Sequence, residues 1–588
     1  MAEITAGEAV VRVLERSGVE AVFGVLSVHN LPLYAAIARR ASMRAVAARS
    51  ETGAVGMADG YARATGRLGV VITSTGVGAA NGAGALLEAY TASSPLLHLT
   101  GQVDSSVVAE ERGALHGAKD QLAMLRSVGK EARRLTRAED APHVTCEAIR
   151  LARSGRPGPV SVEIPIDLQY ATLAEIEVQL DEPERCAPRP DAIASAAERL
   201  ASARRPLIWA GGGVRLADAS GALRALAEWL GAGVITTQAG RGAIPEDHPL
   251  CIGYFGMDPA VEPLLAEADA LLAVGTRFRS NETHNWQLPL PRPLLRIDID
   301  PQEVTRNYQP DLALVGDARL TLEALLRALG ETAPNAHVSG EAPNAPTAPQ
   351  PVHGAAPDPD RRTRAPGPGW RSSPADPDWR ARVADARRAA RARWRAMLGP
   401  HERLLDDLRT TLPRTAIVVR DVTVPATVWG SRLLDVREPR AALHSASMAI
   451  GQGLPMAIGA AVGRPDRVIV LLAGDGGFAT SLGELTTAVQ ERLRLVIILF
   501  NDGGYGILRN LQDAHFGGQR FGVDLHAPDF ARTAEATGAM GCHVASLLEF
   551  SPALSEALAS TGPVLVEVDL QAIGPMATPF TGAARLVP

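Results

Sequence analysis

Short apolar runs alternate with longer amphipathic stretches along most of the chain. The runs, such as RVIVLLAG and LRLVIILF, are far shorter than the roughly 20 residues of a membrane-spanning helix and are typical of buried strands. Between them, apolar residues recur at the spacing of helices. Because strands that alternate with helices form parallel sheets covered on both faces, the pattern predicts an α/β fold of doubly wound parallel sheets.

Three segments repeat this alternation, and 588 residues are too many for a single core. We expect an N-terminal domain at 1–182, a central domain at 190–330 and a C-terminal domain at 379–588. The expected strands are 21–25, 69–75, 95–101 and 159–165, then 206–213, 231–238, 270–278 and 294–300, then 415–422, 467–476, 494–504 and 563–570.

Residues 331–378, between the second and third domains, have a different composition. They are rich in Pro, Ala and Gly and poor in large apolar side chains. Such a segment buries too little surface to offset the entropy lost on ordering. A disordered linker is therefore expected here.

Composition and charge argue against several classes of protein. The chain carries 59 basic and 65 acidic side chains, and no block of Lys and Arg accompanies aromatic residues, so no nucleic-acid partner is expected. The arginine-rich run from Arg380 to Arg395 is expected to be a solvated helix. No membrane partner is expected, and the first residues predict an amphipathic helix rather than a signal peptide. The four cysteines lack metal-site spacing, which favours a reduced, cytoplasmic enzyme.

The stretch GDGGFATSLGELTTAVQERLRLVIILFNDGGYG combines glycine turns with acidic residues at two strand ends. Backbone amides of Gly474, Gly476 and Gly477, at the start of a helix, suit a phosphate group. Asp475 would repel that phosphate unless a divalent cation lay between them. Asp502 follows the next strand, so both carboxylates can converge, and the Gly504 carbonyl could add a third oxygen ligand for Mg²⁺.

This layout resembles the thiamine-diphosphate motif, in which Gly-Asp-Gly precedes Asn-Asn or Asn-Asp by a spacer of this length. The resemblance covers nearly the whole chain outside the linker, and the family is the acetolactate synthase, pyruvate oxidase and benzaldehyde lyase group. It implies thiamine diphosphate and Mg²⁺ as cofactors. Small 2-oxo acids, aldehydes or ketones are the implied substrates, and C–C bond cleavage or formation is the implied reaction.

The resemblance also assigns residues to the cofactor. The stretch SETGAVGMADGYARATGRLGVVITSTGVGAAN is similar to the family segment that opens on a catalytic glutamate, here Glu51, and it ends at Asn81, which is expected to bind the cofactor. In SMAIGQGLP, Ile450 matches the aliphatic side chain under the bent cofactor. Met448 stands where the family usually has a glycine whose carbonyl accepts from the cofactor's amine.

In the resembling family the glutamate domain of one subunit faces the diphosphate domain of another, which implies a homodimer or homotetramer. Some relatives bind FAD in the central domain, others ADP or nothing. Gly211-Gly212-Gly213 after a strand is a weak dinucleotide signal, so FAD is possible but not expected.

Several positions bear on the reaction. Asn281 and Leu511 stand where acetohydroxyacid synthases have an Arg and a Trp, which argues against that activity. His29 falls where benzaldehyde lyase has a histidine, and His116 where it has a glutamine. The leading hypothesis is a decarboxylase or carboligase in which both histidines are catalytic. A flavin-dependent oxidase of the same fold and a non-catalytic cofactor-binding relative are the alternatives.

Overall fold

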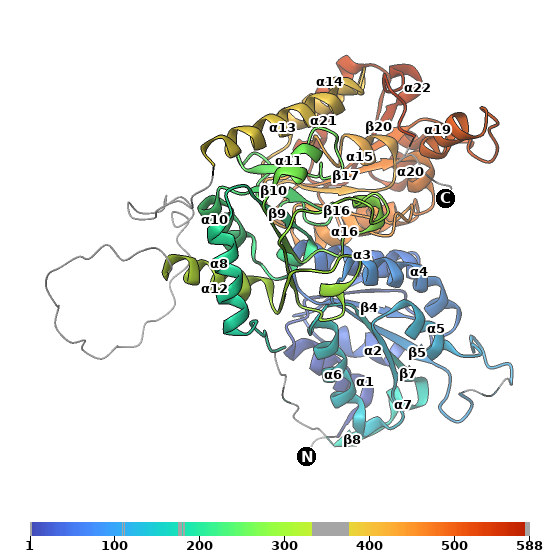
Figure 1. Ribbon diagram of the computed structural model, residues 1–588. Coiled ribbons are helices and arrows are strands. Elements are labelled where there is room, and N and C mark those ends of the chain that lie inside the picture. Colours follow the sequence, from blue (N-terminus) through green and yellow to red (C-terminus); the bar gives the residue numbers. More distant parts are fainter. Residues whose placement is uncertain are drawn as a thin grey trace, which may run out of the picture.

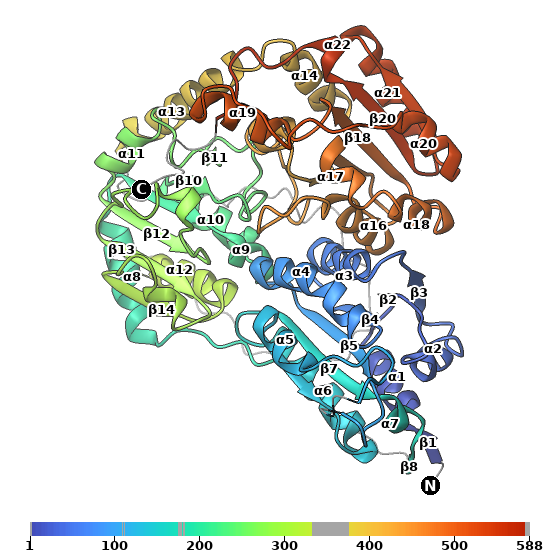
Figure 2. The same ribbon diagram turned by 90° about the vertical axis from the view of Figure 1, so that its right-hand side faces the viewer.

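The computed structural model describes residues 3–331 and 376–581, except for 109, 111, 175–178 and 180–182. Three six-stranded sheets form the framework, and every strand pair within them is parallel. Figure 1 and Figure 2 show them as an N-terminal unit in blue, a central unit in green and a C-terminal unit in orange and red, each with helices on both faces. The predicted fold class is confirmed.

The N-terminal sheet has the strand order β3-β2-β4-β5-β7-β6. Its strands are β2 (Ala21–Gly24), β3 (Arg44–Ala47), β4 (Gly69–Thr73), β5 (Leu96–Gln102), β6 (Glu131–Arg134) and β7 (Pro159–Pro165). Its helices are α1 (Ala6–Arg16), α2 (Leu31–Ile37), α3 (Glu51–Thr65), α4 (Val77–Ala92), α5 (Gln121–Val128), α6 (Ala141–Arg153) and α7 (Ile166–Tyr170). A separate antiparallel pair joins β1 (Glu3–Thr5) to β8 (Thr172–Ala174).

The central sheet has the order β11-β10-β9-β12-β13-β14. Its strands are β9 (Pro206–Ala210), β10 (Gly233–Thr236), β11 (Cys251–Gly253), β12 (Ala270–Val274), β13 (Leu294–Asp298) and β14 (Leu312–Val315). Its helices are α8 (Pro190–Ser202), α9 (Gly212–Leu216), α10 (Ser220–Leu230), α11 (Glu262–Glu267) and α12 (Ala318–Glu331).

The C-terminal sheet has the order β16-β15-β17-β18-β20-β19. Its strands are β15 (Ile417–Arg420), β16 (Ala442–His444), β17 (Ile469–Gly474), β18 (Leu495–Asn501), β19 (Met540–Val544) and β20 (Val564–Asp569). Its helices are α13 (Pro377–Ala396), α14 (His401–Thr411), α15 (Val424–Val428), α16 (Gly453–Gly463), α17 (Asp475–Ala479), α18 (Glu484–Gln490), α19 (Gly506–His515), α20 (Phe530–Thr537), α21 (Leu547–Ala559) and α22 (Leu570–Ile573).

The first and last sheets share one topology. In both, the chain's first strand lies beside its second and third, and its fourth beside its third and sixth. Strand order therefore reverses between β2 and β4, and again between β15 and β17. Loops at the carboxyl ends of strands diverge at such a point and leave room for a ligand.

The N-terminal and C-terminal units pack through α3 and α16, which cross closely. A Cβ atom on Gly60 would lie 2.1 Å from the carbonyl oxygen of Met456, and one on Gly459 would lie 1.8 Å from that of Met57. Only glycine permits this approach, and it lets Val55, Ala58, Ala457 and Ile458 share one buried core. The crossing fixes the orientation of α3 against the C-terminal sheet.

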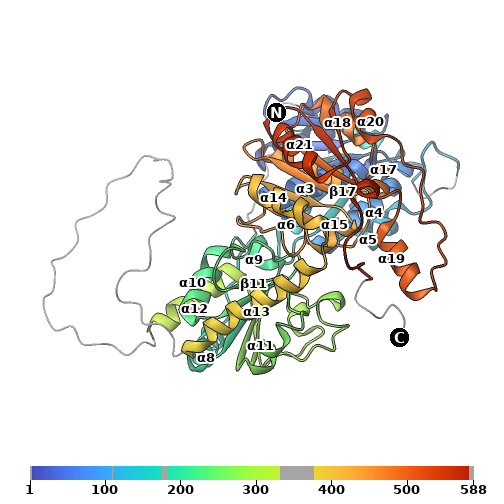
Figure 3. The ribbon, with the colours of Figure 1, turned by 90° about the horizontal axis from the view of Figure 1, so that it is seen from above.

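The arginine-rich run forms the expected helix, α13, with one face exposed, but its other face is packed rather than solvated. Trp379, Val383 and Ala390 are buried, and Trp379 Nε1 donates to the Pro206 carbonyl at 3.0 Å. Figure 3 shows α13 running along the central unit toward α14. The helix thus joins the central and C-terminal cores.

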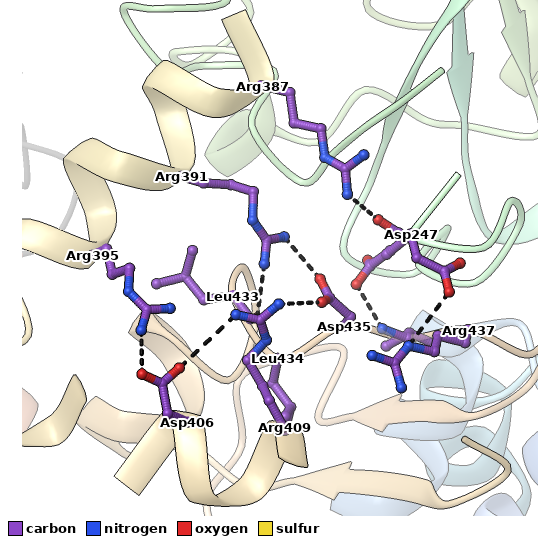
Figure 4. A network of polar contacts seen from close by, with 12 residues as sticks. Asp247, Arg387, Arg391, Arg395, Asp406, Arg409, Leu433, Leu434, Asp435 and Arg437 are labelled. Atoms are coloured by element: carbon purple, nitrogen blue, oxygen red, sulfur yellow. Dashed lines mark hydrogen bonds and ion pairs between the residues drawn. The ribbon is translucent and has the colours of Figure 1, made fainter. Parts of the chain in front are cut away.

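Arginines of α13 are paired rather than free (Figure 4). Arg391 Nη1 lies 2.8 Å from Asp435 Oδ1, and Arg409 Nη2 of α14 lies 3.0 Å from the other oxygen. Arg395 pairs with Asp406, and Arg387 donates to the His248 carbonyl of the central unit at 3.0 Å. The arginines of α13 thus form ion pairs and hydrogen bonds that join the helix to neighbouring segments.

The predicted linker lies almost wholly outside the described residues, but its two ends belong to helices: Glu331 closes α12 and Pro377 opens α13. Among the described helices, none has the length and apolar character needed to cross a membrane.

Candidate functional site

Asp475 and Asp502 lie at the carboxyl ends of neighbouring parallel strands. Gly474 at the end of β17 is level with Phe500 in β18, so the residues that follow these strands meet at one edge of the sheet. Asp475 opens α17 and is buried. The pKa of Asp502 is raised to about 6, first by burial and then by the negative charge of Asp475.

These residues suit a divalent cation. Asp502 Oδ1 is buried without a hydrogen-bond partner, and the nearest positive charge, Arg509 Nη1, is 3.9 Å away. The Gly504 carbonyl faces the same turn, since its oxygen would lie 3.4 Å from a Cβ on Gly476. Two carboxylates and a carbonyl are oxygen ligands of the kind that Mg²⁺ takes beside a phosphate.

The glycine turn before α17 is closely packed. A Cβ on Gly476 would lie 2.7 Å from the Tyr505 ring, and one on Gly474 would lie 2.9 Å from Thr423. Gly477 faces the Asp421 carboxylate at an ordinary contact distance of 3.5 Å. Side chains larger than glycine would therefore push this turn away from Tyr505 and Thr423.

Met448 and Ile450 lie on the loop between β16 and α16. Met448 has a left-handed backbone, with φ of 63°, and both side chains are partly exposed, Met448 at 43% and Ile450 at 38%. The far end of the loop is held by Asp421, whose carboxylate accepts from the amides of Gly451 and Gly453 at 3.0 Å. The loop therefore presents apolar side chains from a fixed backbone.

Asp421 was not predicted as a site residue, although the signal for it was available. It directly follows β15, so it has the same position relative to its strand as Asp475 has to β17. The carboxylate is buried and this raises its pKa. Its amide contacts show that it shapes the loop.

Glu51 is the first residue of α3, where an acidic side chain is favoured by the helix dipole. Asn81 Nδ2 donates to Glu51 Oε2 at 3.2 Å. A Cβ on Gly78 would lie 2.9 Å from Glu51 Oε1, so a side chain at this position would displace the carboxylate. Asn81, which sequence reasoning assigned to the cofactor, thus lies in contact with Glu51.

Glu484 of α18 holds the backbone just before Glu51. Its Oε1 accepts from the amides of Arg49 at 3.1 Å and Ser50 at 3.0 Å. The start of α3 is thereby fixed to the C-terminal unit. Sequence reasoning missed Glu484, because one acidic residue in a helix pattern carries no signal of a contact 435 residues away.

His29 and His116 meet beside the turn between β4 and α4. Their ring centroids are 5.5 Å apart, edge to face. His29 is buried, its Nδ1 has no hydrogen-bond partner, and burial together with the nearby His116 lowers its pKa. A Cβ on Gly76 would lie 1.8 Å from the His116 carbonyl oxygen, so this glycine is required for the His116 loop to approach α4.

The predicted residues thus form two groups. Glu51, Asn81, His29 and His116 surround the start of α4, and the two aspartates, Gly504, Met448 and Ile450 lie at the carboxyl edge of the C-terminal sheet. No hydrogen bond, ion pair or ring contact among the described residues joins one group to the other within the chain.

A cavity of 280 Å³ lies where the three units meet. Gly212 and Gly213, part of the weak dinucleotide signal, line it together with arginines from each unit, among them Arg63, Arg215 and Arg440. In the central unit the cavity lies at the carboxyl edge of β9, the edge at which parallel sheets commonly bind ligands.

Comparison with known proteins covers the same three units. Three family models of thiamine pyrophosphate enzymes match this chain. They are the N-terminal TPP binding domain at residues 4–124, the central domain at 193–325 and the C-terminal TPP binding domain at 425–568. Together these ranges span more than half of the chain.

Curated relatives match over nearly the full length. The chain is 36% identical to a probable 2-ketoarginine decarboxylase of Pseudomonas aeruginosa, over 96% of this chain and 94% of that protein. It is 30% identical to a probable acetolactate synthase large subunit of Methanocaldococcus jannaschii, over 95% and 91%. It is 31% identical to the acetolactate synthase large subunit of Corynebacterium glutamicum, over 94% and 84%. With its three parallel sheets and matching domains, the chain belongs to the thiamine pyrophosphate enzyme family, whose decarboxylases and acetolactate synthases cleave or form C–C bonds.

Proposed function

We propose that this chain is a thiamine-diphosphate-dependent decarboxylase of a 2-oxo acid. The observation that carries the proposal is the pair His29 and His116, which lies with Glu51 around the start of α4. Decarboxylation leaves a carbon that must take up a proton where carbon dioxide departed, and imidazole is well matched to proton transfer near pH 7. The relative named as a 2-ketoarginine decarboxylase supports the same reaction class.

Thiamine diphosphate, when bound, supplies the electron sink for the bond to the carboxylate. Asp475, Asp502 and the Gly504 carbonyl would hold Mg²⁺ against its diphosphate, next to Gly474, Gly476 and Gly477. Ile450 and the Met448 carbonyl would support its ring system. Glu51 would hold and move a proton at the pyrimidine ring, with Asn81 orienting its carboxylate.

We also propose that the working protein is a homo-oligomer in which Glu51 of one chain faces Asp475 of another. Among the residues that the structure describes, no hydrogen bond, ion pair or ring contact joins the Glu51 group to the Asp475 group within the chain. Apolar side chains around both groups are exposed: Val28 58%, Val77 60%, Leu87 44% and Leu508 49%. Burying such side chains between two copies of the chain would be favourable and would complete the site.

Substrate screening tests the reaction. Purified protein with thiamine diphosphate and Mg²⁺ is given a panel of 2-oxo acids, with 2-ketoarginine and pyruvate among them. Carbon dioxide release and aldehyde formation are measured, together with hydroxyketone formation. Release of carbon dioxide with an aldehyde product is expected. Hydroxyketone as the main product would favour a carboligase instead, and flavin absorbance with oxygen uptake would favour the oxidase alternative.

Co-expression of two inactive variants tests the shared site. A Glu51→Gln chain paired with an Asp475→Ala chain has one site with both changes and one with neither. Random pairing should therefore restore about a quarter of the parent activity. Activity no higher than that of either variant alone would show that each chain uses its own residues.

A further inference from the structure

Glu88, on α4 of the N-terminal unit, is buried against the loop that carries Met448 and Ile450. Its Oε2 accepts from the Ser447 amide at 2.8 Å and from the Ser445 hydroxyl at 3.2 Å. The Ser447 hydroxyl also donates to Oε2, and the Ala446 amide donates to Oε1. One carboxylate, 1% exposed, thus accepts four hydrogen bonds from three successive residues of another unit.

The charge of Glu88 is balanced by α3. Arg63 Nη1 lies 3.7 Å from Glu88 Oε1 and 3.1 Å from Asp59 Oδ2, and its Nη2 donates to the His444 carbonyl at 2.7 Å. Arg63 and Asp59 belong to the helix that begins with Glu51. The carboxylate is therefore linked to the loop on one side and to the helix of Glu51 on the other.

The loop is held by all three units of the chain. Arg279 of the central unit donates to the Ala446 carbonyl at 2.7 Å, and Asp421 of the C-terminal unit accepts from the Gly451 amide. Between these contacts the backbone takes the left-handed φ of Met448, which a non-glycine residue adopts only when its surroundings hold it there. Glu88 supplies the hydrogen bonds by which the N-terminal unit holds this loop.

We propose that Glu88 is a positioning residue that fixes the loop of Met448 and Ile450 against α3 of its own chain. This rests on the proposed function, in which that loop supports the cofactor's ring system. Glu88 touches neither substrate nor cofactor; it acts through the Ala446 and Ser447 amides.

Glu88→Gln is the sharpest test because it preserves size. The two backbone amides each need an acceptor, one at Oε1 and one at Oε2. A glutamine side chain offers one acceptor oxygen and one NH₂ group, so in either orientation one amide loses its partner. The matched control is Glu163→Gln, which alters a buried carboxylate of the same unit that pairs with Arg134 at 2.7 Å, away from the loop.

Backbone hydrogen exchange in the full-length, cofactor-free protein reads the loop directly. Glu88→Gln should speed exchange in peptides covering 445–451 by about tenfold or more, while Glu163→Gln leaves them at the parent rate. In the protein loaded with thiamine diphosphate and Mg²⁺, deuterium exchange at the reactive thiazolium carbon should slow by up to about 10²-fold, with diphosphate affinity nearly unchanged. Unchanged loop exchange overturns the proposal, and so does faster loop exchange with unchanged deuteration of the cofactor.

Two further measurements keep the outcome clear. If Glu88→Gln does not fold, Ser447→Ala removes one donor and leaves the carboxylate, and should raise exchange in the same peptides to a smaller extent. If the parent protein does not bind thiamine diphosphate, the proposed function fails, whereas the cofactor-free exchange still reports whether Glu88 holds the loop.

Discussion

His29 and His116 lie edge to face, with 5.5 Å between their ring centroids, although 86 residues of sequence, including helices α2, α3 and α4, stand between them.

 The contact is made by the sheet, because His29 follows β2 and His116 follows β5 at the same carboxyl edge. Burial and, after it, the charge of His116 lower the pKa of His29.

His116→Gln removes a positive charge beside His29, so the pKa of His29 should rise toward its ordinary value of 6.5. If His29 is the proton donor, the alkaline limb of the pH–rate profile, along which the protonated donor is lost, should move to higher pH with it. NMR titration of ¹³C-labelled histidine measures the pKa itself, and an unchanged His29 titration in the folded variant would contradict the coupling.

Replacing both histidines should separate catalysis from cofactor binding. His29→Ala and His116→Ala should each lower turnover, by up to about 10²–10⁴-fold if that residue is the proton donor, with thiamine diphosphate affinity nearly intact. Steady-state kinetics and calorimetry check this. Parent turnover in both single variants and in the double variant would assign the histidines a structural role.

The two aspartates should make cofactor binding depend on metal. In the parent protein, calorimetry should show tighter binding of thiamine diphosphate with Mg²⁺ than without it, since the cation separates buried carboxylates from the diphosphate. Asp475→Asn should remove most of that difference. Asp513→Asn, on an exposed ion pair with Arg520, is the control and should keep it. Equal affinity with and without Mg²⁺ in the parent would rule out the predicted metal site.

His98 should make stability depend on pH. It is buried between Thr73 and Ser161, and burial lowers its pKa to about 3. Below pH 6.5 the unfolded chain takes up a proton that the folded protein does not, so stability falls as the pH falls from 6.5 toward 3. The contribution is about 2 kcal/mol between pH 6.5 and 5.

Denaturant unfolding at several pH values measures that contribution. His98→Asn should reduce the slope of unfolding free energy against pH in this window. His143→Asn, at an exposed position on α6, should keep the parent slope. A slope unaffected by His98→Asn would mean that other groups account for it.

The ion pairs of α13 should matter for stability according to burial. Asp435, whose side chain is 7% exposed, pairs with both Arg391 and Arg409. Asp435→Ala leaves two guanidinium groups without their partner and should cost about 3 kcal/mol. Asp385→Ala breaks an exposed pair with Arg388 on the same helix and should cost less than about 1 kcal/mol. Chemical denaturation measures both, and equal costs would contradict the role assigned to burial.

The apolar pattern by itself determined the interior of each sheet. The four strands expected in every unit are the four inner strands of its sheet, and both edge strands were missed each time: β3 and β6, β11 and β14, and β16 and β19. Inner strands are covered on both faces and read as continuous apolar runs. Edge strands are partly exposed, as in β3 and β6, or only three residues long, as in β11 and β16, so their pattern is weak.

Part of the site followed from the same logic. Asp475 and Asp502 could be placed together because each directly follows an inner strand, and β17 and β18 are indeed parallel neighbours. Glu51, Ile450 and the histidines were found by resemblance to a family, since nothing in their local pattern distinguishes them from a helix start, a core side chain or a surface ring.

Only the tertiary structure decided how the units hold one another. Glu88 and Glu484 bond backbone amides of another unit, and Arg391 pairs with Asp435 across two segments. A sequence pattern reports which face of an element is apolar, and these contacts are polar and lie between elements far apart along the chain. The N-terminal and C-terminal units that Glu88 and Glu484 join are brought together by the close crossing of α3 over α16, which depends on the absence of side chains at Gly60 and Gly459.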